Sequence, residues 1–109
     1  MNFWFERMPY LEEFARTHRV LHMGPGRQPP LGVAVDNSRA VRPHVLADLN
    51  RTPYPFRNDS FDAAYAFSVI EHLDNFFGVF AELHRIVKPG GFLLWNTKEK
   101  VGRRNTTPS

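Results

Sequence analysis

The chain has 109 residues, the length of a single domain, and contains no cysteine, so disulfide bridges and thiolate metal sites are excluded. Hydrophobic residues make up 42% of the chain and Phe alone occupies 10 positions, which is typical of a folded globular protein rather than a disordered one. The formal charge of +3 is concentrated after residue 97, which leaves a neutral body, so we do not expect a nucleic-acid partner.

The organisation that we expect is one domain without a membrane segment. No apolar stretch reaches the ~20 residues of a membrane span. The first residues lack the basic and apolar parts of a signal peptide, so we expect a cytoplasmic protein. Within the domain, we expect an N-terminal segment with a helix over 1–19, a ligand-binding core over 20–97 and a basic flexible tail over 98–109.

The first predicted element is a helix over residues 8–18, because Pro9 suits the first helical position and acidic residues precede basic ones along it. Its buried face is expected to consist of Leu11, Phe14, Ala15 and His18. Short apolar runs then predict strands over 20–23, 33–35, 44–47, 61–67 and 92–96. Continuous apolar strands that alternate with crossovers indicate a buried, mostly parallel sheet in an α/β protein.

The crossovers differ in length. A second helix is expected over 74–88 and ends at Lys88-Pro89-Gly90-Gly91. The connections 24–31 and 37–43 are too short for a full helix, so one face of the second and third strands would be covered at most by the first helix. Such an apolar face favours self-association, and we note a homo-oligomer as a possible partner. The face of the second helix that we expect to be buried consists of Phe77, Phe80, Ala81, His84 and Val87.

A glycine turn and an aspartate mark the ligand site. Gly24-Pro25-Gly26 separates the first two strands, and the second strand ends at Asp36. Glycine has no Cβ, so the backbone can approach a ligand closely. A carboxylate after the second strand can accept the hydroxyls of a ribose. The pattern indicates a nucleotide-like ligand, and the alternative is an ordinary strand-turn-strand with a surface aspartate.

Further landmarks follow in a fixed order. Asp48-Leu49-Asn50 precedes Pro53-Tyr54-Pro55-Phe56, and Ser60-Phe61-Asp62 precedes Val69-Ile70-Glu71-His72-Leu73 and then Glu82–Gly91. With the glycine turn, these landmarks make residues 20–97 resemble the S-adenosylmethionine-dependent methyltransferases with a Rossmann-like fold, in the branch with a short loop after the turn. The resemblance implies a five-stranded sheet of order 3-2-1-4-5, C-terminally truncated relative to the seven-stranded family fold. It also implies S-adenosylmethionine as the cofactor, bound at the carboxyl ends of the strands.

The resemblance assigns roles by position. The two glycines would lie under the methionine part, Asp36 would hold the ribose hydroxyls, and Asp48 would face the exocyclic amine of the adenine. His22 stands where the family usually has an acid that helps to hold the methionine end. The implied cofactor-binding residues are Gly24, Pro25, Gly26, Asp36, Asn37, Asp48, Leu49, Phe67 and Ser68.

Catalytic residues are less well defined by the sequence. Methyl transfer needs a base only when the acceptor must first lose a proton, and Glu71 and His72 are the candidates. The alternative for these two residues is that they hold the start of a helix. The histidines show no metal-ligand spacing, so we expect no metal.

A dinucleotide is the rival ligand for this site. Its fingerprint requires a third glycine at the position of Pro29, and its pyrophosphate requires a helix N-terminus. A connection that contains Pro29-Pro30 cannot form that helix. S-adenosylmethionine carries no phosphate, so this physical difference favours the methyl donor.

Two functions therefore remain open. The first is an active methyltransferase that acts on a small-molecule or unidentified acceptor. The second is a truncated or degenerate methyltransferase-like domain that binds the cofactor weakly or serves as an interaction module without catalysis.

Overall fold

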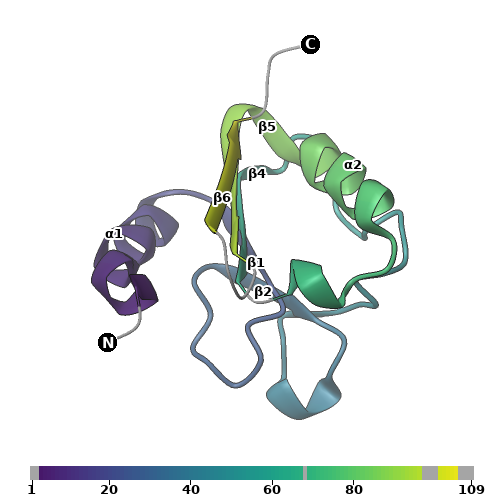
Figure 1. Ribbon diagram of the computed structural model, residues 1–109, viewed down its shortest axis with the longest axis horizontal. Coiled ribbons are helices and arrows are strands. Elements are labelled where there is room, and N and C mark those ends of the chain that lie inside the picture. Colours follow the sequence, from purple (N-terminus) through teal and green to yellow (C-terminus); the bar gives the residue numbers. More distant parts are fainter. Residues whose placement is uncertain (1–2, 68, 97–100, 106–109) are drawn as a thin grey trace.

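The computed structural model describes residues 3–67, 69–96 and 101–105. In this part of the chain, one sheet lies between two helices, α1 (Phe3–Thr17) and α2 (Phe76–Ile86), which cover its opposite faces (Figure 1). Two short 3-10 helices, η1 (Arg39–Val41) and η2 (Ile70–His72), follow the second and fourth strands. The strands are β1 (Val20–Met23), β2 (Val33–Asp36), β3 (Val45–Leu46), β4 (Phe61–Phe67), β5 (Val87–Asn96) and β6 (Val101–Asn105).

The sheet has the order β3-β2-β1-β4-β5-β6, and its first five strands in sequence run parallel to one another. The predicted order 3-2-1-4-5 is therefore confirmed. The order reverses between β1 and β4, which lie side by side in the middle of the sheet. Ligands of open α/β sheets bind at the carboxyl ends of the strands beside such a reversal.

The sixth strand was not expected. Residues 101–105, which we placed in a flexible tail, form β6 and pair antiparallel with β5 from Phe92↔Asn105 to Asn96↔Val101. Without β6, β5 would be an edge strand with a row of unpaired backbone groups, which can pair with another chain. The pairing of β6 with β5 satisfies these groups. The expectation of a tail over 98–109 is wrong for these five residues, and the rest of that range lies outside the described residues.

The sheet separates two hydrophobic cores. Leu21 and Met23 of β1 face the core that contains Val79, Leu83 and Ile86 of α2. Val20 of β1 faces the smaller core on the other side, against which residues of α1 pack. Alternate side chains of a strand point to opposite faces, so β1 contributes to both cores.

α1 starts earlier than the sequence predicts and has Pro9 in its interior. Of the expected face, Leu11, Phe14 and Ala15 pack against the smaller core as predicted. His18 does not. It lies after the end of the helix, is exposed, and stacks on the Phe14 ring with 3.9 Å between ring centroids.

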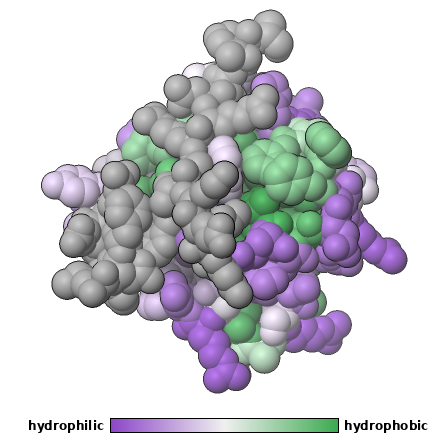
Figure 2. Space-filling model, viewed as in Figure 1, coloured by the Kyte–Doolittle hydropathy of each residue, from purple (hydrophilic) through white to green (hydrophobic). Residues whose placement is uncertain are grey.

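The buried face of α2 differs in part from the expected one. Phe80 packs against the larger core and Val87, which begins β5, is buried, as expected. Phe77 is 89% exposed, and Ala81 and His84 are exposed as well. Apolar surface accordingly gathers over α2 in Figure 2. The buried residues are Val79, Glu82, Leu83 and Ile86. The sequence contains two apolar stripes at helical spacing. The stripe that is buried includes Glu82, and a glutamate is typical of an exposed helix face.

β5 also starts earlier than expected. The segment Lys88-Pro89-Gly90-Gly91 was predicted only to end the helix, but it lies within β5 as an irregularity. Phe61 of β4 pairs with Val87 and Ala63 with Phe92, so the intervening β5 residues bulge out of register. A bulge is compatible with proline and glycine, because the residues in it need not donate to the ladder.

The two short crossovers contain no α-helix, as expected. The exposed sheet face that we expected beside them is small, because Ala34 and Val35 of β2 are only 3% and 1% exposed. Leu46 of the outer strand β3 is 46% exposed. Among the described helices, none has the length and apolar character that crossing a bilayer requires.

Candidate functional site

The glycine turn after β1 adopts a conformation that requires glycine. Gly24 and Gly26 have φ angles of +60° and +63°, in the left-handed region that L-residues with a Cβ avoid. The Gly24 N–H donates to the Val35 carbonyl at 2.8 Å, which fixes the turn against β2. A Cβ on Gly24 would also collide with the side chain of Val69. Both the backbone conformation and the packing against Val69 therefore require glycine at position 24.

Asp36 ends β2 directly beside this turn. Its Oδ2 accepts a hydrogen bond from the Gly26 N–H at 3.1 Å, and its Oδ1 accepts one from the Ser38 N–H at 3.1 Å. The residue is 7% exposed. Each carboxylate oxygen has a second acceptor site, so both oxygens can still accept hydrogen bonds from a ligand. The carboxylate is thus oriented by the turn that the sequence places next to it.

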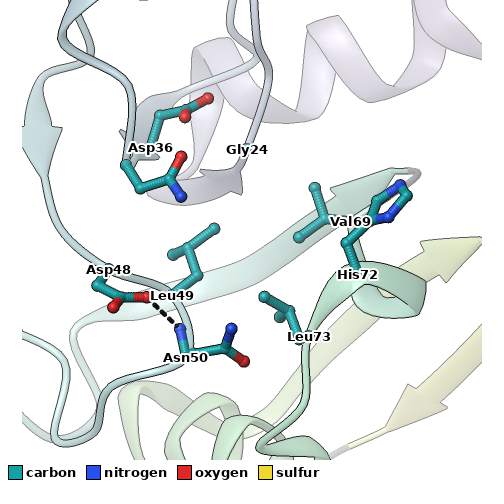
Figure 3. Close-up of a pocket in the computed structure, with 9 residues that line it drawn as sticks. Gly24, Asp36, Asp48, Leu49, Asn50, Val69, His72 and Leu73 are labelled. Carbon is teal, nitrogen blue, oxygen red and sulfur yellow. Dashed lines mark hydrogen bonds between the residues drawn. The ribbon is translucent and has the colours of Figure 1, made fainter.

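A pocket of about 240 Å³ opens beside these residues. Figure 3 shows Asp36 and Gly24 at one end, with Leu49 facing Val69 across the space. The pocket combines carboxylates with aliphatic side chains, a mixture that suits a ligand with both polar and flat apolar parts. Its lining consists of Gly24, Asp36, Asn37, Asp48, Leu49, Asn50, Val69, His72 and Leu73.

The structure brings together most of the residues singled out in the sequence. Gly24, Asp36, Asn37, Asp48, Leu49 and His72 share the pocket. Pro25, Gly26, Phe67 and Glu71 are not among its lining residues, and Ser68 lies outside the described residues. Gly26 contributes through its N–H to Asp36. Phe67 points to the other face of the sheet, where it packs with the smaller core.

Three lining residues, Asn50, Val69 and Leu73, are not among the site residues that the sequence predicts. All three belong to segments that the sequence marked as landmarks, so their positions carried a signal. The Asn50 side chain joins two walls of the pocket, because its Oδ1 accepts from the N–H groups of Asp74 at 2.8 Å and Asn75 at 3.2 Å. It therefore connects the segment after β3 to the segment after β4.

A partly buried ion pair on α2 supports the wall that contains Asp48 and Leu49. Arg85 donates to both carboxylate oxygens of Glu82, at 2.8 and 2.7 Å. This hydrogen bonding by Arg85 holds the pKa of Glu82 below its ordinary value, and the Tyr54 N–H, 2.6 Å from Glu82 Oε1, acts in the same direction. Arg85 also donates to the carbonyls of Tyr54 and Phe56 at 3.1 and 2.8 Å.

His22, the residue that replaces the family's acid, faces away from the pocket. It is 3% exposed and packs edge-on against Phe67, with 5.8 Å between ring centroids. Its Nδ1 accepts a hydrogen bond from the Leu31 N–H at 2.9 Å. Burial lowers the pKa of His22 to about 4, so the ring is neutral near pH 7. His22 thus holds the end of the loop that follows the glycine turn.

The fold and this pocket define a class of protein. Residues 28–95 match a family model described as a methyltransferase domain, and this match spans more than half of the chain. The chain therefore belongs to the methyltransferase-domain family, whose cofactor is S-adenosylmethionine.

Known proteins resemble parts of the chain. Sterol 24-C-methyltransferase ERG6B of Gibberella zeae is 40% identical over 47 residues, which cover 43% of this chain and 12% of that protein. Sterol methyltransferase-like 1 of Botryococcus braunii is 38% identical over 64 residues, or 59% and 15% of the two chains. The solved structure of an S-adenosylmethionine-dependent methyltransferase from Mesorhizobium loti superposes with a TM-score of 0.65 at 21% identity, covering 84% of this chain and 52% of that one. The chain thus spans a small part of both sterol methyltransferases and about half of the solved structure.

Proposed function

We propose that this chain binds S-adenosylmethionine in the pocket between Gly24 and Leu49 and transfers its methyl group to an acceptor. The observation that supports this proposal most directly is the Asp36 carboxylate. It is nearly buried, is oriented by the Gly26 N–H at 3.1 Å, and lines the pocket at the end of β2. This is where open α/β sheets place the acid that binds ribose hydroxyls.

The residues present fit the cofactor. Asp36 has free acceptor sites for the ribose hydroxyls, and Asp48 is an acceptor for the adenine amine. Leu49, Val69 and Leu73 offer an apolar enclosure for a flat ring. Nothing lies within 4 Å of the position that a Cβ of Gly26 would take, so the backbone of the turn is accessible there for the methionine part.

The bound cofactor would supply an electrophilic methyl group on its sulfonium. The task of the protein is then to align donor and acceptor, which can contribute ~7–11 kcal/mol to lowering the barrier. His72 lines the pocket and can accept a proton from an acceptor that must lose one. The names of the two sterol methyltransferases make sterols the first acceptors to assay.

Isothermal titration with S-adenosylmethionine tests the proposal. The wild type should bind, and Asp36→Asn should bind about ten- to hundredfold more weakly, because a hydrogen bond to a charged group contributes roughly 1.5–3 kcal/mol. Asp62→Asn is a matched control, because its carboxylate also accepts a backbone N–H, from Arg19 at 2.8 Å, but it is absent from the pocket lining. Equal affinities of wild type and Asp36→Asn would refute the assignment of this pocket.

A cofactor-binding module without catalysis is the second candidate. It is favoured by His22, whose Nδ1 is occupied by the Leu31 N–H, so the residue before the turn offers no acid to the methionine end. A panel of acceptors with methyl-labelled cofactor separates the candidates. Label transfer to any acceptor supports the enzyme, whereas binding without transfer across sterols and other small molecules supports the module.

A further inference from the structure

The wall of the pocket that contains Asp48, Leu49 and Asn50 belongs to a segment without regular structure. No helix or strand is present between the end of β3 at Leu46 and the start of β4 at Phe61. Backbone hydrogen bonds tie this segment to its neighbours near its two ends, as between the Ala47 N–H and the Asp36 carbonyl at 3.0 Å. Between those ends, side-chain hydrogen bonds help to fix its position.

Besides the hydrogen bonds of Asn50 with Asp74 and Asn75, a second set comes from α2 and converges on Tyr54. The Glu82 carboxylate accepts the Tyr54 N–H at 2.6 Å, and the Arg85 guanidinium donates to the Tyr54 carbonyl at 3.1 Å. The N–H and the carbonyl of Tyr54 are thus both held by one partly buried ion pair. Asn58 adds a further contact, because its Oδ1 accepts from Arg85 at 2.9 Å.

The Tyr54 side chain connects this hydrogen-bonded segment to the pocket lining. Its hydroxyl donates to the Leu49 carbonyl at 2.7 Å, and the two residues are only 3% and 5% exposed. Leu49 lines the pocket, whereas Tyr54 does not. The hydroxyl therefore fixes a wall residue from behind, at a buried bond that water cannot replace.

We propose that Tyr54 is a positioning residue for the cofactor, and that its hydroxyl holds Leu49 and the adjoining carboxylate of Asp48 where the adenosine part binds. The proposal rests on the proposed function, because it assumes that the cofactor occupies this pocket. It predicts that removal of one buried hydroxyl, outside the lining, weakens every ligand that contains adenosine.

The chain offers a matched control for this test. Tyr65 is also buried, and its hydroxyl also donates to a backbone carbonyl, that of Leu11 at 3.3 Å. That bond joins β4 to α1, on the face of the sheet away from the pocket. Tyr54→Phe and Tyr65→Phe therefore delete the same chemical group, and only the first deletes support of the pocket.

The experiment is isothermal titration of both variants with S-adenosylmethionine and with 5′-methylthioadenosine, which lacks the amino-acid part. Tyr54→Phe should bind both ligands about fivefold more weakly, the effect of losing one typical hydrogen bond. Tyr65→Phe should bind both as the wild type does, even where its thermal stability falls equally. Hydrogen exchange at the amides of residues 49–51 should quicken only in Tyr54→Phe.

The possible results are distinguishable. Wild-type affinity in Tyr54→Phe, or equal weakening in both variants, would overturn the positioning role while leaving the proposed function intact. Failure of the wild type to bind either ligand would overturn the proposed function and this inference together. Arg85→Lys is a second variant, because a lysine lacks the fork that reaches the Tyr54 and Phe56 carbonyls together, and it should weaken the same ligands.

Discussion

The buried His22 predicts that the protein loses stability on mild acidification. Protonation of its ring would add a charge in a site that is 3% exposed and would remove the acceptor of the Leu31 N–H. The pKa falls from its ordinary 6.5 to about 4 in the folded state. The His22 ring therefore binds a proton more tightly in the unfolded chain than in the folded one. Its contribution to the free energy of unfolding is complete above about pH 6.5 and is lost as the pH falls toward 4.

The magnitude follows from that difference. At ~1.4 kcal/mol for each pH unit, the full effect is roughly 3 kcal/mol, and about 2 kcal/mol of it is lost by pH 5. Urea unfolding at pH 7 and pH 5 measures it. The acids whose pKa is lowered, Asp62 and Glu82, have ordinary values of 3.8 and 4.5, so their stabilising contribution is lost mainly at lower pH.

His22→Asn provides the comparison, because the asparagine carbonyl oxygen can accept the Leu31 N–H but does not titrate in this range. The wild type should lose about 2 kcal/mol of its free energy of unfolding between the two pH values, and the variant should lose much less. If both proteins lost the same amount, the assignment of the effect to His22 would be refuted.

Three further predictions concern packing and the pocket. Gly24→Ala should weaken cofactor binding and lower the melting temperature, because its Cβ meets Val69 and its φ of +60° is strained, and titration and thermal unfolding measure both. Glu82→Ala should cost about 1–3 kcal/mol of unfolding free energy in urea, because it leaves the Tyr54 N–H without its acceptor and Arg85 without its charged partner. Phe77→Ser should change that free energy by less than about 0.5 kcal/mol, because the ring is 89% exposed.

The sheet and part of the pocket were predictable because their signals are local. Apolar runs define the five parallel strands, and the glycine turn followed by Asp36 predicts where the site lies. Five of the nine residues implied to bind the cofactor line the pocket. The order of the motifs along the chain is enough to predict these five.

The rest depends on contacts between distant residues. The buried face of α2 includes Glu82, which is stable there only because Arg85 and the Tyr54 N–H neutralise and satisfy it. The pairing of β6 with β5 brings a basic segment back to a sheet edge, and no local pattern announces it. The loop contact of His22 with Leu31 likewise requires the fold before it can be seen.

The two cores on either side of the sheet give β4 a simple parity rule. Ala63 and Tyr65 belong to the core beneath α1, whereas Ala64 and Ala66 belong to the core that also contains the pocket residues Leu49 and Val69. The rule holds after the register irregularity between Phe61 and Ala63, because Phe61 packs in the pocket-side core despite its odd number. A saturation scan of positions 63–66 would therefore sort by odd and even positions. Changes at the odd positions would alter the melting temperature alone, and changes at the even positions would alter it together with ligand affinity.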